Sequence, residues 1–151
     1  MKSKVGERPE FWNDMTESLL FRFPVTVYYE DTDAAGIVYY ANYLRYAERA
    51  RTEMLRGTGF ASSKLMAENG LALGVRRCNV DYRRPARLDD ELEVETRVVR
   101  VDGASLELEQ LVYRDDEVLV AMDIKLGCMT LDGKPARLPG DVRQALREHL
   151  A

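Results

Sequence analysis

The sequence predicts an α+β domain in which one long helix precedes an antiparallel sheet of about five strands, and a further helix ends the chain. Three observations support this prediction. Apolar residues recur every three or four positions from 43 to 55, alternate with polar residues between 77 and 126, and return to helical spacing after 139. The chain has 151 residues, of which 46% are hydrophobic and 32% charged, as is typical of one globular domain.

The N-terminal part predicts a strand followed by two helices. Residues 22–29 are β-branched and aromatic, which favours a first strand. A helix is expected from Asn42, which would be its N-cap, to the stop signals Gly57 and Gly59. A second, short helix is expected over residues 61–69. The predicted inward residues of the long helix are Tyr43, Tyr46, Ala47, Ala50, Met54 and Leu55.

After Gly70 the spacing of apolar residues changes to two, which predicts half-buried strands. Asp102-Gly103 is expected to form a tight hairpin with positive φ, and Asp115-Asp116 and Asp132-Gly133 mark two more turns. The predicted inward residues of the four strands are Cys78, Val80 and Tyr82; Leu92, Val94, Thr96 and Val98; Leu106, Leu108, Gln110 and Val112; and Val118, Val120, Met122, Ile124 and Leu126. The terminal helix, 139–150, would turn inward Val142, Ala145, Leu146 and either His149 or Leu150.

Charge and composition exclude several function classes. The net charge is −4 and the pI is near 5.2, whereas a nucleic-acid-binding protein needs a basic face. No apolar run approaches the roughly 20 residues of a membrane helix, and no hydrophobic stretch follows the N-terminal lysines. We therefore expect a cytoplasmic protein. Cys78 and Cys128 are expected to be core residues or idle thiols, because two distant cysteines do not make a metal site.

The residue types available for catalysis point to carboxylates. His149, the single histidine, lies two residues from the C-terminus, where it suits the negative end of a helix dipole. A Ser-His-Asp hydrolase, a zinc site and a dinucleotide fingerprint all lack their residues. A carboxylate is a modest nucleophile or base, so it suits a substrate with a good leaving group. A thioester is such a substrate, because a thiol has a pKa of about 8.5.

One segment places carboxylates beside a helix start. Residues 29–43 read YEDTDAAGIVYYANY, so Asp33 and Gly36 lie between the first strand and the long helix. Free backbone N–H groups at the helix start would then share a small space with a negative charge. By its chemistry alone, this segment could also be an acidic loop that caps a helix.

The same segment, continued by Ala47–Glu53, resembles the signature of hot-dog-fold acyl-CoA thioesterases. The similarity extends through residues 80–96 and covers roughly residues 22–130. The chain most resembles the YbgC-like group, associated with the Tol-Pal system and related to 4-hydroxybenzoyl-CoA thioesterase. The resemblance implies a sheet wrapped around a central helix in one domain, 21–151. Residues 1–20 would be an extension that the resemblance does not cover.

The resemblance assigns roles to individual residues. Asp33 is expected to be the catalytic carboxylate, either as nucleophile or as general base. The backbone N–H of Tyr40 is expected to polarise the thioester carbonyl, and one such donor contributes about 3 kcal/mol. No metal or other cofactor is expected. Coenzyme A counts here as part of the substrate. The expected substrate contacts are Gly36, Ile37, Val38, Asn42, Arg84, Arg100 and Ser105.

The chain departs from the group at two places. Tyr40 stands where YbgC-like proteins commonly have histidine, which puts the identity of the acyl group in question more than the reaction. Relatives often carry a basic residue in the hairpin before Ser105, where this chain has Asp102-Gly103-Ala104. The expected cations for the phosphates of coenzyme A are Arg83, Arg84, Arg87 and Arg100.

The resemblance also implies partners. Hot-dog relatives form dimers or tetramers with active sites between subunits, so we expect a homodimer or homotetramer. The Tol-Pal association suggests envelope or lipid-metabolism proteins as partners. One alternative is a module that binds acyl-CoA or a protein without catalysis. A second alternative, a hydratase for enoyl thioesters, would need an internal histidine, which the sequence lacks.

Overall fold

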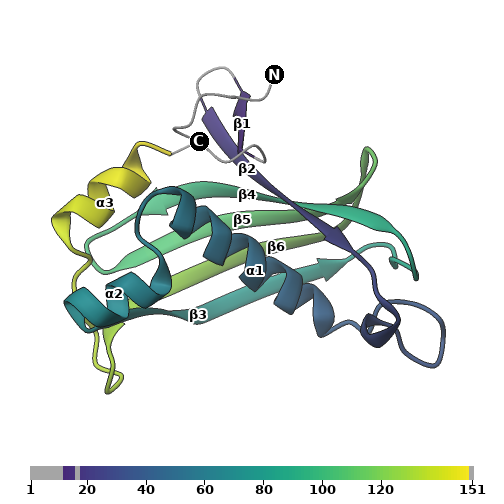
Figure 1. Cartoon of the computed structure of the whole chain (residues 1–151), viewed down its shortest axis with the longest axis horizontal. Coiled ribbons are helices and arrows are strands. Elements are labelled where there is room, and N and C mark those ends of the chain that lie inside the picture. Colours follow the sequence, from purple (N-terminus) through teal and green to yellow (C-terminus); the bar gives the residue numbers. More distant parts are fainter. Residues whose placement is uncertain (1–11, 16–17, 150–151) are drawn as a thin grey trace.

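The computed structural model describes residues 12–15 and 18–149, which form one antiparallel sheet and three α-helices (Figure 1). The strands are β1 (Trp12–Met15), β2 (Ser18–Thr26), β3 (Leu71–Tyr82), β4 (Glu91–Val101), β5 (Ser105–Arg114) and β6 (Glu117–Thr130). The helices are the 3-10 helix η1 (Tyr29–Asp31) and the α-helices α1 (Asn42–Gly57), α2 (Ser62–Asn69) and α3 (Gly140–Arg147).

The strands lie in the order β1-β2-β4-β5-β6-β3, and every pair is antiparallel. The five long strands confirm the predicted sheet, and the four-residue β1 pairs with β2 as an addition that the sequence did not predict. β3 pairs with β6 on one side alone among the described strands. One edge of the sheet is therefore a twelve-residue strand with unpaired backbone groups.

The core lies between α1 and the sheet face that it crosses (Figure 1). Tyr46, Ala47 and Ala50 are fully buried on one side of α1, as the helical spacing predicted. Phe21 of β2 and Leu108 of β5 belong to the same core cluster. Each large apolar side chain buried in this way contributes about 1.5–3 kcal/mol. The contact between α1 and the sheet therefore supplies much of the stability of the fold.

Two of the buried residues that the alternation placed inward, Thr96 and Gln110, are polar, and the larger is Gln110. Its side chain is fully buried under α1. The amide nitrogen of Gln110 donates to the carbonyl of Ala47 at 3.0 Å and to the hydroxyl of Thr96 at 2.9 Å, and its oxygen accepts from Arg51 at 3.1 Å. Because a buried amide is costly unless its hydrogen bonds are made, these contacts hold α1 at one position on the sheet.

Three predicted boundaries and the predicted conformation of one glycine are wrong. β2 begins at Ser18 rather than at residue 22, and it ends at Thr26 because η1 begins at Tyr29. Asn42 is the first helical residue rather than the N-cap, because its side chain donates to the carbonyl of Asp31 at 2.8 Å. Asp102 and Gly103 form the predicted hairpin between β4 and β5, but Gly103 does not have positive φ. Its missing side chain leaves room for the guanidinium of Arg137, which would lie 2.8 Å from a Cβ there.

The terminal helix forms over a shorter range than predicted. α3 ends at Arg147 and contacts β4. Val142 and Leu146 are buried, and Ala145 and His149 are half-buried, which confirms the predicted inward face. Leu150 lies outside the described residues.

Candidate active site

The motif segment folds as a small hairpin that leads into α1. The N–H of Tyr39 donates to the carbonyl of Asp31, and the N–H of Asp33 donates to the carbonyl of Ile37, both at 2.9 Å. Gly36 closes the turn by donating to the carbonyl of Asp33 at 2.9 Å, with φ at +78°. A glycine suits this left-handed position because it has no Cβ.

Asp33 lies in the first arm of this hairpin with an exposed side chain. One carboxylate oxygen accepts the N–H of Ala35 at 2.9 Å, which orients the group within the turn. The second oxygen has no hydrogen-bond partner among residues 12–15 and 18–149. The carboxylate is therefore held by one bond and keeps an oxygen available to water or substrate.

Tyr40 joins the hairpin to the first turn of α1. Within the described part of the chain, neither its backbone N–H nor that of Ala41 has an acceptor. The next N–H, of Asn42, donates to the carbonyl of Tyr39 at 2.8 Å. Free N–H groups at a helix start carry partial positive charge and suit an oxygen that becomes negative.

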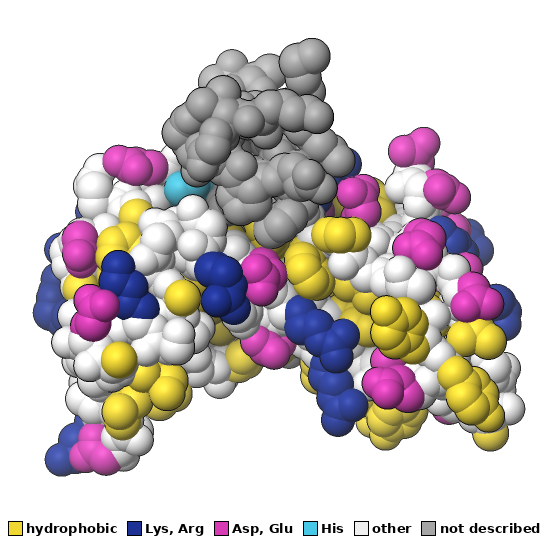
Figure 2. Space-filling model, in the orientation of Figure 1, with side chains coloured by type: hydrophobic (Ala, Val, Ile, Leu, Met, Phe, Trp, Pro, Cys, Tyr) yellow, Lys and Arg dark blue, Asp and Glu magenta, His cyan; other side chains and the backbone are white. Residues whose placement is uncertain are grey.

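A pocket of about 240 Å³ opens beside Tyr40. The rings of Tyr40 and Tyr43 lie 5.9 and 5.8 Å from the ring of Tyr82. Burial raises the pKa of Tyr82 above its usual value, so this hydroxyl is neutral at physiological pH. Figure 2 shows hydrophobic side chains gathered on the side of the molecule where α1 begins. The pocket is lined by Ile37, Val38, Tyr40, Tyr43, Tyr82, Arg83, Arg84 and Pro85.

The structure brings some of the predicted site residues to this pocket. Ile37, Val38, Tyr40 and Arg84 all line it, and Asp33 lies in the same hairpin as Ile37 and Val38. The Arg84 guanidinium also pairs with Glu117 at 2.7 Å. Asn42 is buried and does not line the pocket. Its side chain donates a hydrogen bond to the carbonyl of Asp31 in the hairpin instead.

Arg100 and Ser105 lie elsewhere in the same chain. The strand pairing places Tyr82 at the same level of the sheet as Val94 of β4. Arg100 follows Val94 by six residues, which is about 20 Å along β4. Arg100 pairs with Asp102 at 3.0 Å, and this bond raises the pKa of Arg100 and lowers that of Asp102. Ser105 also donates to Asp102, at 3.4 Å. Both side chains therefore bind Asp102, far from the pocket beside Tyr40.

Tyr82, Tyr43 and Pro85 complete the pocket, and none of them was among the predicted site residues. The available signal was the end of the β3 alternation at Tyr82, directly before two arginines and a proline. This position could have been recognised as a strand end facing the motif. Its pairing with Tyr40 needed the three-dimensional structure, because the two residues are 42 positions apart.

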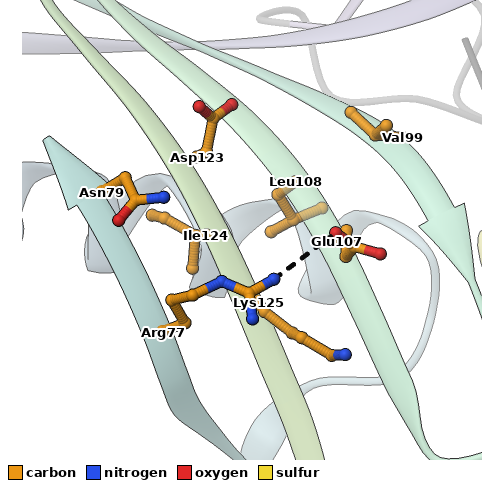
Figure 3. A pocket seen from close by; sticks show the side chains of 8 residues that line it. All are labelled: Arg77, Asn79, Val99, Glu107, Leu108, Asp123, Ile124 and Lys125. Atoms are coloured by element: carbon orange, nitrogen blue, oxygen red, sulfur yellow. Dashed lines mark ion pairs between the residues drawn. The ribbon is translucent and has the colours of Figure 1, made fainter. Parts of the chain in front are cut away.

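Another hollow, of about 130 Å³, lies on the sheet face turned away from α1 (Figure 3). Arg77 and Glu107 form an ion pair at 3.9 Å across it, and Asp123 and Lys125 add one charge of each sign. It contains no residue of the motif. Among the described residues, no group of three or more His, Cys, Asp and Glu side chains could hold a metal ion. No described helix has the length and apolar character needed to span a membrane.

Comparison with known proteins gives the family. Residues 27–146 match the thioesterase-like superfamily. The chain belongs to this superfamily. It is 46% identical over 126 residues to the acyl-CoA thioesterase YbgC of Haemophilus influenzae, which covers 83% of this chain and 93% of that protein. The acyl-CoA thioester hydrolase YbgC of Escherichia coli is also 46% identical, over 82% of this chain and 92% of its own length.

A solved structure agrees with this assignment. The probable thioesterase from Bartonella henselae superposes with a TM-score of 0.76 at 37% identity, over 80% of this chain and 99% of that one. The family, the hot-dog fold and the enzyme class expected from the sequence, a thioester hydrolase, are confirmed. The roles of individual residues stay predictions.

Proposed function

We propose that this protein hydrolyses acyl-CoA to a carboxylic acid and free coenzyme A, with Asp33 as the catalytic carboxylate and the Tyr40 N–H as the donor to the thioester oxygen. The observation that carries this proposal is the free N–H of Tyr40 at the rim of an apolar pocket, directly after the hairpin that holds Asp33. The YbgC relatives, at 46% identity over most of the chain, support acyl-CoA as the substrate.

Two routes fit this arrangement. As a general base, Asp33 removes a proton from water while the oxygen of that water attacks the thioester carbon. As a nucleophile, Asp33 attacks the carbon itself and forms an anhydride, which water then hydrolyses. In both routes the C–S bond breaks, coenzyme A leaves as a thiolate, and the Tyr40 N–H stabilises the charge on the carbonyl oxygen. Neither route involves a metal or a redox cofactor.

The release of free thiol from a panel of acyl-CoAs tests the proposal. Short-chain, long-chain and benzoyl-type thioesters should be compared, and we expect turnover with at least one of them. The preferred acyl group would define what the pocket beside Tyr40 accepts. Binding of acyl-CoA without thiol release from any substrate would contradict hydrolysis and favour the non-catalytic binding module.

We further propose that the protein acts as a homodimer in the cytoplasm, joined along β3. The free edge of β3 spans twelve residues, and Val75 on it is 54% exposed. A long edge strand with unpaired backbone groups can pair with a second copy about a two-fold axis. A tetramer and envelope or lipid-metabolism partners stay predictions of the resemblance.

The substitution Val75→Glu is expected to shift the protein toward the monomer, because two like charges would lie along the paired edges. Light scattering after size-exclusion chromatography would measure the mass. Leu131→Glu is the control, since Leu131 is 62% exposed and lies in the turn after β6. A parent protein that is monomeric at all concentrations, or a Val75 variant that stays dimeric, would contradict this interface.

A further inference from the structure

The backbone of Ala86 links the hairpin to α1. Ala86 is fully buried in the loop between β3 and β4. Its N–H donates to the hydroxyl of Tyr43 at 2.9 Å, and its carbonyl accepts the N–H of Val38 at 2.9 Å. Val38 precedes Tyr40 by two residues, and Tyr43 follows it by three. One peptide segment therefore fixes the chain on both sides of Tyr40.

The loop that carries Ala86 is itself held in place. Arg114 of β5 pairs with Asp90 at 2.7 Å, and its guanidinium also donates to the carbonyl of Pro85 at 3.4 Å. Ile37 forms a β-bridge with Arg87 on the other side of Ala86. The loop is therefore a firm support between the sheet and the hairpin.

The Tyr43 side chain connects α1 to this loop. It is 3% exposed, and its ring contacts Tyr46 and Tyr82. Burial raises the pKa of Tyr43, so its hydroxyl is neutral and can accept the N–H of Ala86. Tyr43 lies in the first turn of α1, while Ala86 lies in the loop between β3 and β4. Their hydrogen bond therefore sets how far α1 lies from the hairpin.

We propose that the Tyr43 hydroxyl is a positioning group that aims the Tyr40 N–H at the substrate carbonyl. This inference rests on the proposed function, because it assigns Tyr43 a part in the same reaction. Donors in such sites act through preorganised geometry, so a small displacement reduces their effect strongly. Tyr43 acts through Ala86 and the backbone around Tyr40, without contact between its hydroxyl and the reacting atoms.

The test is the substitution Tyr43→Phe, which removes one oxygen and keeps the ring. We expect kcat to fall about tenfold while KM changes less than about twofold, because the donor is misplaced but the pocket stays. Tyr46→Phe is the matched control in the same helix. The Tyr46 hydroxyl is also buried and faces the Asp31 carboxylate, but it has no hydrogen-bond partner within normal geometric limits. This control should keep the kcat of the parent protein.

A spectroscopic measurement separates positioning from general loosening of the fold. In an Asp33→Asn background, the infrared stretch of an isotope-labelled thioester carbonyl reports its hydrogen bond to Tyr40. Adding Tyr43→Phe should move this stretch to higher frequency, and adding Tyr46→Phe should leave it unchanged. Equal kcat and equal stretch in both variants, with an active parent, would overturn the role of Tyr43 and leave the proposed function intact. A parent without turnover would overturn both.

Discussion

The substitution Asp33→Asn is expected to lower kcat by about a hundredfold or more, because an amide is neither a nucleophile nor a base toward water. The variant should keep its structure. The side-chain oxygen of asparagine can still accept the N–H of Ala35, which the Asp33 carboxylate accepts at 2.9 Å. Substrate binding should therefore persist, and the loss should appear in kcat rather than in KM. Thiol release and the binding of acyl-CoA to the variant would measure the two effects separately.

Glu30→Gln is the matched control for this experiment. Glu30 lies in η1, three residues before Asp33, and is exposed. The control removes the same charge from the same segment, so a purely electrostatic effect of the acidic run would lower both activities. A Glu30 variant with parental activity beside an inactive Asp33 variant would assign catalysis to Asp33. An Asp33 variant as active as the parent would refute that assignment.

The fold could be predicted largely from local patterns. Helical spacing from Tyr43 to Leu55 and the alternation from Leu92 to Val98 both match the buried faces of α1 and β4. Such patterns depend on which residues face the core, so one sequence is enough to recognise them. The extent of β3 was harder to predict. This strand begins at Leu71, but its first four residues are all half-buried and do not alternate. A β-bulge then interrupts its pairing between Val75 and Arg77 and shifts the alternation of the residues that follow.

The candidate site could be predicted only where it is continuous in the sequence. Asp33, Gly36 and Tyr40 lie in one motif, and the hairpin holds them together. The opposite wall of the pocket comes from Tyr82 and the loop after it, which meets the motif through long-range contacts. The predicted N-cap role of Asn42 was wrong for a similar reason, since its partner lies eleven residues away. As a sequence position it suits an N-cap, but its side chain turns to the carbonyl of Asp31 instead.

The largest effect on stability is expected from Gln110→Ala. This substitution empties a fully buried site under α1 and removes the hydrogen bonds to Ala47, Thr96 and Arg51. We expect the free energy of unfolding to fall by about 3 kcal/mol, from the cavity and from the polar groups left without partners. Urea denaturation at a fixed protein concentration would measure the change, since an oligomer makes stability depend on concentration.

Two methionine variants separate the polar contribution from the cavity. Gln110→Met keeps the volume and loses the hydrogen bonds, and we expect a cost of about 2 kcal/mol because buried polar groups lose their partners. Leu108→Met changes a buried residue on the same face of β5 and should cost less than about 1.5 kcal/mol. Burial lowers the pKa of Arg51, and its guanidinium donates to the Gln110 oxygen at 3.1 Å. Adding Arg51→Met to Gln110→Met should therefore cost less than the sum of the two single changes, and strict additivity would contradict a network that holds α1.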